Sequence, residues 1–181
     1  MRITSLTPDL WPEFRAFLAR TELPSLAVVE QEGPADSQRF FCAVAEGRVI
    51  GCTSLVPGCD RVFLDRGGAR TEMPCTYLCS TEVLPEYRGQ GAGSALYAHR
   101  IAACPESDLA LEIRGTGTPY SVHRQARKGL MWHTSRGFRV VGRSRDPDGG
   151  PVLWRPRRPP LPEPSRRGRP PSAHGPDLRA P

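Results

Sequence analysis

Residues 83–94 read VLPEYRGQGAGS and join two segments of different character. The run before them, TYLCSTEVLP (76–85), is typical of a strand, and the run after them, ALYAHRIAA (95–103), is typical of a helix. Gly89, Gly91 and Gly93 lack side chains, so the backbone N–H groups at the start of that helix stay uncovered. Uncovered amides and the positive end of a helix dipole favour an anion, usually a phosphate, and Arg88 adds a forked donor. The stretch therefore predicts an anion-binding site in the turn that connects a strand to the following helix.

The length of 181 residues predicts one domain, and the composition limits it to residues 1–156. From Arg155 onward the chain contains nine of its 20 prolines and no aromatic residue. Such a segment has almost nothing to bury. We therefore expect residues 157–181 to form a disordered tail rich in proline and arginine.

The positive charge of the chain is concentrated in this tail. The net charge is +6, and the segment from Arg155 onward carries seven arginines against Glu163 and Asp177. The rest of the chain is therefore close to neutral, and we expect no nucleic-acid binding by the folded domain. The tail is expected to be a solvated extension, with contact to RNA, lipid or an acidic partner as the alternative.

Cysteine content and hydropathy indicate where the protein resides. The first 14 residues contain no apolar stretch of the signal-peptide kind, and no run of 18 apolar residues exists, so we expect a cytoplasmic protein with no membrane contact. The six cysteines are then expected to be small buried side chains. No Cys or His spacing is typical of zinc, so no metal site is expected.

The remaining pattern predicts an alternation of strands and helices, and hence an α/β (α+β) domain with a mixed sheet. A long polar connection is expected over residues 58–75, and such connections are usually functional or mobile. Thr7 is the expected N-cap of the first helix, and Gly137 is expected to end the last one. In chain order the expected elements are a strand at 2–5, a helix at 7–20, a hairpin at 40–57 turning at Glu46 and Gly47, a strand at 76–85, a helix at 91–103, a strand at 109–115, a helix at 125–138, and a hairpin formed by 138–145 and 151–156.

The run VLPEYRGQGAG (83–93) resembles the acyl-CoA signature of the GNAT acetyltransferase superfamily, V-x-P-x-x-R-G-x-G-x-G. The order of elements over residues 1–156 is similar to that family too. The resemblance implies a GNAT-like, mostly antiparallel mixed sheet flanked by helices, with a splayed central strand. A P-loop is excluded because no Gly-Lys-Ser/Thr follows the glycines, and a dinucleotide fingerprint fits poorly because the turn falls mid-chain.

The resemblance also assigns residues to acetyl-CoA, which would be the co-substrate. The backbone of Val83, Leu84 and Pro85 would pair with the pantetheine arm. The pyrophosphate would be held by the glycine-rich turn, namely Arg88, Gly89, Gln90, Gly91, Ala92, Gly93 and Ser94. The alternative is a tight turn whose glycines serve geometry alone.

Catalytic residues are less defined by the sequence. The family usually protonates the departing thiolate with a tyrosine four residues before a terminal Gly-Phe, and this position is His133, whose ordinary pKa near neutrality suits the task. The family's base positions correspond to Tyr77, which would orient a water, and Cys79. Glu82 and Glu112 are the nearby carboxylates that would act through water. A reaction without a base, driven by proximity, is an open alternative.

These observations predict transfer of an acetyl (acyl) group from acetyl-CoA to a primary amine of a small molecule, by direct attack in a ternary complex. Acylation of Cys79 is the less favoured route. The alternative function is a weakly catalytic or non-catalytic CoA-binding protein that recruits an acidic partner through its basic tail. The acceptor is expected between the first helix, residues 58–75 and the last hairpin, and a homodimer is left open.

Overall fold

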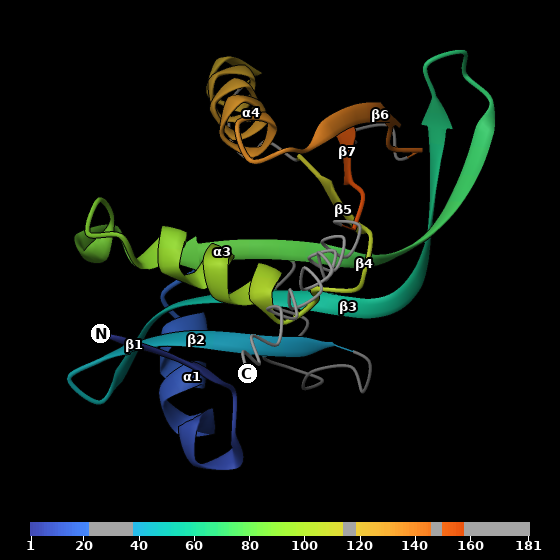
Figure 1. Ribbon diagram of the computed structural model, residues 1–181. Helices are drawn as coiled ribbons and strands as arrows, with labels where there is room; N and C mark the ends of the chain where they lie inside the picture. Colours follow the sequence, from blue (N-terminus) through green and yellow to red (C-terminus); the bar gives the residue numbers. More distant parts are fainter. Residues whose placement is uncertain (22–37, 114–118, 146–149, 158–181) are drawn as a thin grey trace, which may run out of the picture.

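Within the described residues, seven strands form one mixed sheet in the computed structural model (Figure 1). The structure describes residues 1–21, 38–113, 119–145 and 150–157, so the predicted tail lies almost entirely outside it. The strand order is β1-β2-β3-β4-β5-β7-β6, and only β4 and β5 pair in parallel. This confirms the predicted fold class. The strands are β1 Arg2–Ser5, β2 Arg39–Ala45, β3 Arg48–Asp65, β4 Arg70–Val83, β5 Leu109–Glu112, β6 Arg139–Arg143 and β7 Pro151–Arg155.

Three α-helices flank this sheet in the part of the chain that is described: α1 Trp11–Leu18, α3 Ala92–Ala102 and α4 Pro119–Thr134. A short 3-10 helix, Pro8–Leu10, precedes α1, and Thr7 lies at its N-cap position as predicted, but the Thr7 side chain makes no capping hydrogen bond. Pro8 and Pro12 start the two helices by their fixed φ instead. The last helix begins six residues earlier than predicted, and Gly137 (φ +86°) ends it as expected.

Helices α1 and α3 cover opposite faces of the N-terminal half of the sheet (Figure 1). Alternate residues of a strand point to opposite faces. In β2, Phe40 packs in the cluster of α1, whereas Phe41 packs in the cluster of α3. The predicted hairpin between β2 and β3 is confirmed, and it turns at Glu46 (φ +51°) and Gly47 (φ +80°).

The structure corrects the prediction for residues 58–75. This segment is a continuation of β3 and β4 into one long antiparallel hairpin, with register pairs from Cys59↔Cys75 to Leu64↔Arg70. The polar centre that suggested a loop is only the turn, where Asp65 Oδ1 accepts hydrogen bonds from the N–H groups of Gly67 and Ala69.

The tip of this hairpin arches over and pairs with β6, the far edge of the sheet (Figure 1). The register pairs are Leu64↔Arg143 and Asp65↔Gly142, so β3, β4, β5, β7 and β6 close into a ring. Gly142 permits this approach, because a Cβ there would lie 2.1 Å from the carbonyl oxygen of Leu64.

Strands β4 and β5 separate soon after they meet. Their register contains only Thr76↔Leu109 and Tyr77↔Ala110. Beyond Tyr77, β4 continues to Val83 with no register partner in β5. This opening between the two strands is the predicted splay of the central strand.

Candidate functional site

The glycine-rich turn exposes the N-terminus of α3. Gly89 and Gly91 have φ of +77° and +86°, and a Cβ at either would meet nothing within 4 Å. The N–H of Ala95 donates to the carbonyl of Gly91, so the amides of residues 92–94 have no partner within the helix. No side chain caps this helix. The helix N-terminus is therefore open, with uncovered amides of the kind that bind anions, and the anion site itself stays a prediction.

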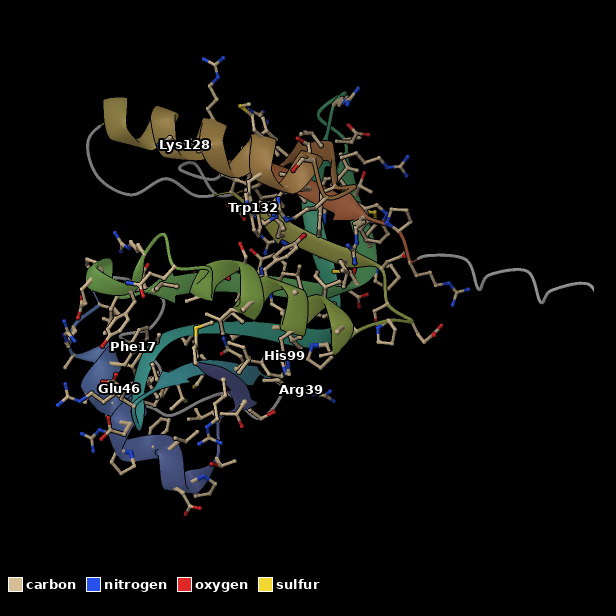
Figure 2. All side chains as sticks on the ribbon, turned by 60° about the vertical axis from the view of Figure 1, so that its left-hand side comes forward. Phe17, Arg39, Glu46, His99, Lys128 and Trp132 are labelled. Carbon is tan, nitrogen blue, oxygen red and sulfur yellow. The ribbon has the colours of Figure 1, made fainter. Side chains whose placement is uncertain are left out.

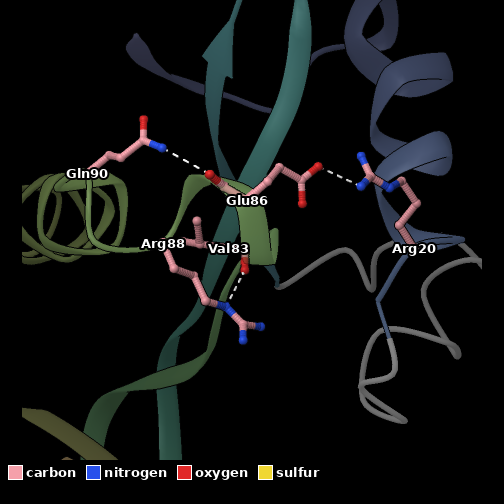
Figure 3. A network of polar contacts seen from close by, with 5 residues as sticks. All are labelled: Arg20, Val83, Glu86, Arg88 and Gln90. Atoms are coloured by element: carbon pink, nitrogen blue, oxygen red, sulfur yellow. Dashed lines mark hydrogen bonds and ion pairs between the residues drawn. The ribbon is translucent and has the colours of Figure 1, made fainter.

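Arg88 lies beside this helix terminus and is held by the end of β4 (Figure 3). Its Nε donates to the carbonyl of Val83 at 2.9 Å, and its Nη2 forms a 2.6 Å ion pair with Glu82. Glu82 is thus engaged by Arg88, which argues against its predicted role as a base. That role and the phosphate-binding role of Arg88 both stay predictions.

A second set of contacts fixes the shape of the turn. Glu86 forms a 2.6 Å ion pair with Arg20 at the end of α1, and its backbone carbonyl accepts a hydrogen bond from Gln90 Nε2 at 2.9 Å (Figure 3). Gln90, predicted to touch pyrophosphate, therefore spans the turn from Glu86 across to the start of α3.

Tyr77 belongs to a cluster that the sequence did not reveal. The guanidinium of Arg61 lies 4.6 Å from the centre of the Tyr77 ring and pairs with Glu112, whose side chain is fully buried. Arg61 comes from the arched hairpin and Glu112 from β5, so their proximity depends on the closed ring of strands. Glu112 is an ion-pair partner here, which leaves it poorly suited to be a base.

His133 lies in an aromatic environment on α4. Its ring centre is 4.9 Å from that of Trp132, 5.6 Å from Phe138 and 5.7 Å from Tyr97. Figure 2 shows Trp132 directed from α4 toward the body of the molecule, whereas Lys128 extends away from it. Burial, followed by the charges of Arg100 and Arg136, lowers the pKa of His133 from 6.5 to about 4. The side chain is therefore neutral at pH 7, contrary to the expectation of a pKa near neutrality.

This pKa has a consequence for stability that can be measured. The unfolded state binds a proton at His133 below about pH 6.5, and the folded state does so only near pH 4, so the free energy of unfolding falls through this window by up to about 3 kcal/mol. We expect urea unfolding of His133→Gln to show a smaller loss between pH 7 and pH 4.5 than the wild type. Equal losses in the two proteins would contradict a buried neutral histidine.

The predicted catalytic residues lie on the two sides of the sheet. In β5, Ala110 packs in the cluster of Tyr77 and Trp154, whereas Leu109 and Leu111 pack in the cluster that contains Tyr97 and Phe138. Tyr77 therefore faces one side, and His133 packs on the other. The two sides meet where the pairing of β4 with β5 ends, after Tyr77↔Ala110.

Other predicted contributors are not assembled at this opening. Burial raises the pKa of the Cys79 thiol, which disfavours the thiolate needed for an acyl-enzyme. A cavity of about 550 Å³ lies elsewhere, lined by residues 5–8, Trp11, residues 38–41 and Ala103, and it contains none of the predicted site residues.

Within the described residues, no group of three or more His, Cys, Asp or Glu side chains is arranged to hold a metal. No helix in that part of the chain is long and apolar enough to cross a membrane.

Comparison with known proteins identifies this arrangement. The sequence model of the Acetyltransferase (GNAT) family matches residues 3–122, which is more than half of the chain. The chain belongs to the GNAT acetyltransferase family. No curated protein matches it in sequence.

Solved GNAT structures share the fold at low identity. A histone acetyltransferase HPA2 and related acetyltransferase from Corynebacterium glutamicum is 19% identical, with a TM-score of 0.58 over 88% of this chain and 98% of that one. An aminoglycoside 6'-N-acetyltransferase complexed with coenzyme A is 14% identical, with a TM-score of 0.58 over 88% and 98%. The GphF GNAT-like decarboxylase in complex with isobutyryl-CoA is 20% identical, with a TM-score of 0.56 over 87% and 100%. These proteins differ in what they act on, so the similarity establishes the fold alone.

Two arginines beside the end of the β4–β5 pairing were missed by sequence reasoning. Arg61 lay in the segment expected to be a loop. Arg100 lies at the spacing of Leu96 and Cys104 on the buried face of α3, and a charged residue at a core position was a signal that could have been used.

Proposed function

We propose that this protein transfers an acetyl or other acyl group from its CoA thioester to a primary amine of a small molecule. The observation that carries the proposal is the open N-terminus of α3 beside the separation of β4 and β5. The helix N-terminus would bind the pyrophosphate of CoA. The edge of β4 that has no register partner in β5 would bind the pantetheine arm, whose amides can pair with a strand. Acetyl-CoA would supply the activated acyl group.

Each part of the co-substrate is assigned to residues of the turn and of the end of β4. The amides of Ala92, Gly93 and Ser94, with Arg88, would hold the pyrophosphate, and the backbone of residues 83–85 would pair with the pantetheine. Arg88 Nε donates to the carbonyl of Val83 at 2.9 Å, so it would also orient the first peptide group offered to the arm. These assignments agree with the resemblance to the GNAT signature.

The amine would approach from the side of Tyr77, and the thioester from the side of α3 and His133. The nitrogen attacks the acyl carbon through the opening, a C–N bond forms, the C–S bond breaks, and one proton leaves the amine. We infer that neutral His133 donates a hydrogen bond to the departing sulfur, since its lowered pKa leaves little imidazolium at pH 7. Positioning of two bound reactants supplies most of the rate.

The hairpin arched onto β6 encloses the Tyr77 side, which favours a small acceptor over a protein chain.

The test is CoA release from acetyl-CoA, detected with a thiol reagent, in the presence of pooled small amines. We expect turnover with at least one pool and a fall of at least about tenfold in His133→Gln. Unchanged turnover in that variant would remove His133 from the mechanism and keep the enzyme.

The second candidate is a CoA-binding protein without catalysis. The observation that favours it is that burial lowers the pKa of His133 to about 4 and raises the pKa of the Cys79 thiol, so both groups are shifted away from 7. CoA binding with no turnover in any amine pool, with acetyl and longer acyl donors, would make this the leading function.

A further inference from the structure

Arg100 is a buried cation on α3. Its relative exposure is 2%, and it forms no ion pair with a carboxylate of the described residues. Burial lowers its pKa to about 10, so it remains charged at pH 7. A buried charge without a counter-charge costs several kcal/mol, so its presence at this site requires compensation from other contacts.

The contacts that Arg100 makes are with the backbone of β3 and β4. Its Nη1 donates to the carbonyl of Cys79 at 2.6 Å and lies 3.4 Å from the carbonyl of Ser54. The register of the two strands is shifted at this point, because Thr53 pairs with Thr81 whereas Leu55 pairs with Leu78. Residues 79 and 80 of β4 therefore oppose a single residue of β3, which is a β-bulge.

A bulge removes backbone groups from the strand ladder, and side chains replace the lost bonds here. Arg100 satisfies the carbonyl of Cys79, and the hydroxyl of Thr53 donates to the carbonyl of Ser80 at 3.2 Å. The bulge begins two residues after Tyr77, the last residue of β4 that pairs with β5. Arg100 and Thr53 thus determine the shape of β4 along the opening.

Arg100 also places its charge next to His133. The guanidinium carbon lies 5.6 Å from the centre of the Tyr97 ring, which lies 5.7 Å from the centre of the His133 ring. Arg100 Nε, the Tyr97 hydroxyl and His133 Nδ1 are buried and have no hydrogen-bond partner among the described residues. The charge of Arg100 has no counter-charge among the described residues and acts on His133, so this part of the core has a positive potential that favours an anion.

We propose that Arg100 is a positioning residue for acyl transfer, which fixes the bulge of β4 at the opening and provides the positive charge that stabilises the departing thiolate. The proposal rests on the proposed function, because it takes the thioester sulfur to lie beside His133. If Arg100 stabilises the thiolate, His133 does not have to be protonated for the thiolate to leave. The thiolate leaves as an anion, and the proton lost by the amine passes to solvent.

The first experiment compares Arg100→Met with Arg100→Lys, using Arg139→Met as a control that removes an exposed positive charge on β6. We expect kcat to fall about 100-fold in Arg100→Met with little change in KM for acetyl-CoA, and Arg100→Lys to recover about tenfold. Wild-type kcat in a folded Arg100→Met would overturn the proposal. The proposal would also be overturned if Arg100→Met lost kcat, CoA affinity and melting temperature together and Arg100→Lys recovered none of them. That pattern is expected of a residue with a structural role alone.

The second experiment needs no acceptor and measures the affinity of CoA relative to desulfo-CoA between pH 6.5 and 9. A free thiol has a pKa near 8.5, so a thiolate stabilised by Arg100 makes CoA gain roughly five- to tenfold over desulfo-CoA as the pH rises. We expect this gain in the wild type and its loss in Arg100→Met. If the wild type transfers no acyl group but shows the gain, the proposed function fails and the role of Arg100 stands. A flat ratio in the wild type overturns the role of Arg100.

Should Arg100→Met fail to fold, Thr53→Val provides an independent test of the bulge. Valine has nearly the shape of threonine but lacks the hydroxyl, so this variant removes the bond to the Ser80 carbonyl and the contact with the Thr81 hydroxyl. We expect kcat to fall about tenfold with CoA affinity retained. An unchanged kcat in Thr53→Val would contradict the importance of the bulge.

Discussion

Reversal of charge at Arg88 is expected to reduce CoA affinity by at least about 100-fold, as measured by titration calorimetry. Arg88→Glu removes a forked donor beside the N-terminus of α3 and places a carboxylate next to Glu82, its present partner. Two carboxylates would then face the site proposed for the pyrophosphate. Arg88→Ala, which removes the donor without adding a negative charge, is expected to lie between the wild type and Arg88→Glu.

The matched control is Arg20→Glu. Arg20 pairs with Glu86 in the same turn, so this variant makes the same charge change a short distance away (Figure 3). Exposed ion pairs contribute little to stability, and we expect both variants to remain folded and Arg20→Glu to bind CoA within about fivefold of the wild type. CoA binding by Arg88→Glu equal to that of Arg20→Glu would show that the pyrophosphate lies elsewhere.

The features that the sequence predicted correctly are local. The glycine turn, the start of α3 and the hairpin at Glu46 and Gly47 depend on residues that are close together in the chain and whose backbone preferences are strong. The family signature is a run of this kind, so the family and its fold followed from eleven consecutive residues.

The features that were missed depend on contacts between distant residues. Residues 58–75 contain a proline, three glycines and several charges that are typical of a loop, yet they form strands that pair with each other and, at the tip, with β6. The pairing of Arg61 with Glu112 spans 51 positions, and it exists only when that ring of strands has closed. The pKa of His133 could not be predicted either, because its burial is produced by Tyr97 and Phe138 from other elements.

Closure of the hairpin onto β6 is expected to be lost when Gly142 is replaced by alanine. A Cβ at this position would lie 2.1 Å from the carbonyl oxygen of Leu64 and 2.6 Å from the Phe63 ring, and backbone on both strands would have to move. Overpacking of this kind costs about 3 kcal/mol in the free energy of unfolding, which urea titration measures. CoA binding should be retained, because the helix terminus that would hold it lies on the other half of the sheet, whereas KM for the amine should rise with the loss of the enclosed side.

Gly129→Ala is the matched control. Gly129 lies in α4, and a Cβ there would be 3.6 Å from the Ile113 side chain, which is an ordinary van der Waals contact. Alanine is the better helix former, so this variant should be unchanged or more stable by up to about 1 kcal/mol. The same chemical change thus has opposite expected signs at the two glycines. If Gly142→Ala is as stable as Gly129→Ala, the tip of the hairpin does not contact β6 in solution, and the pairing of Arg61 with Glu112 and the enclosure of Tyr77 lose their basis.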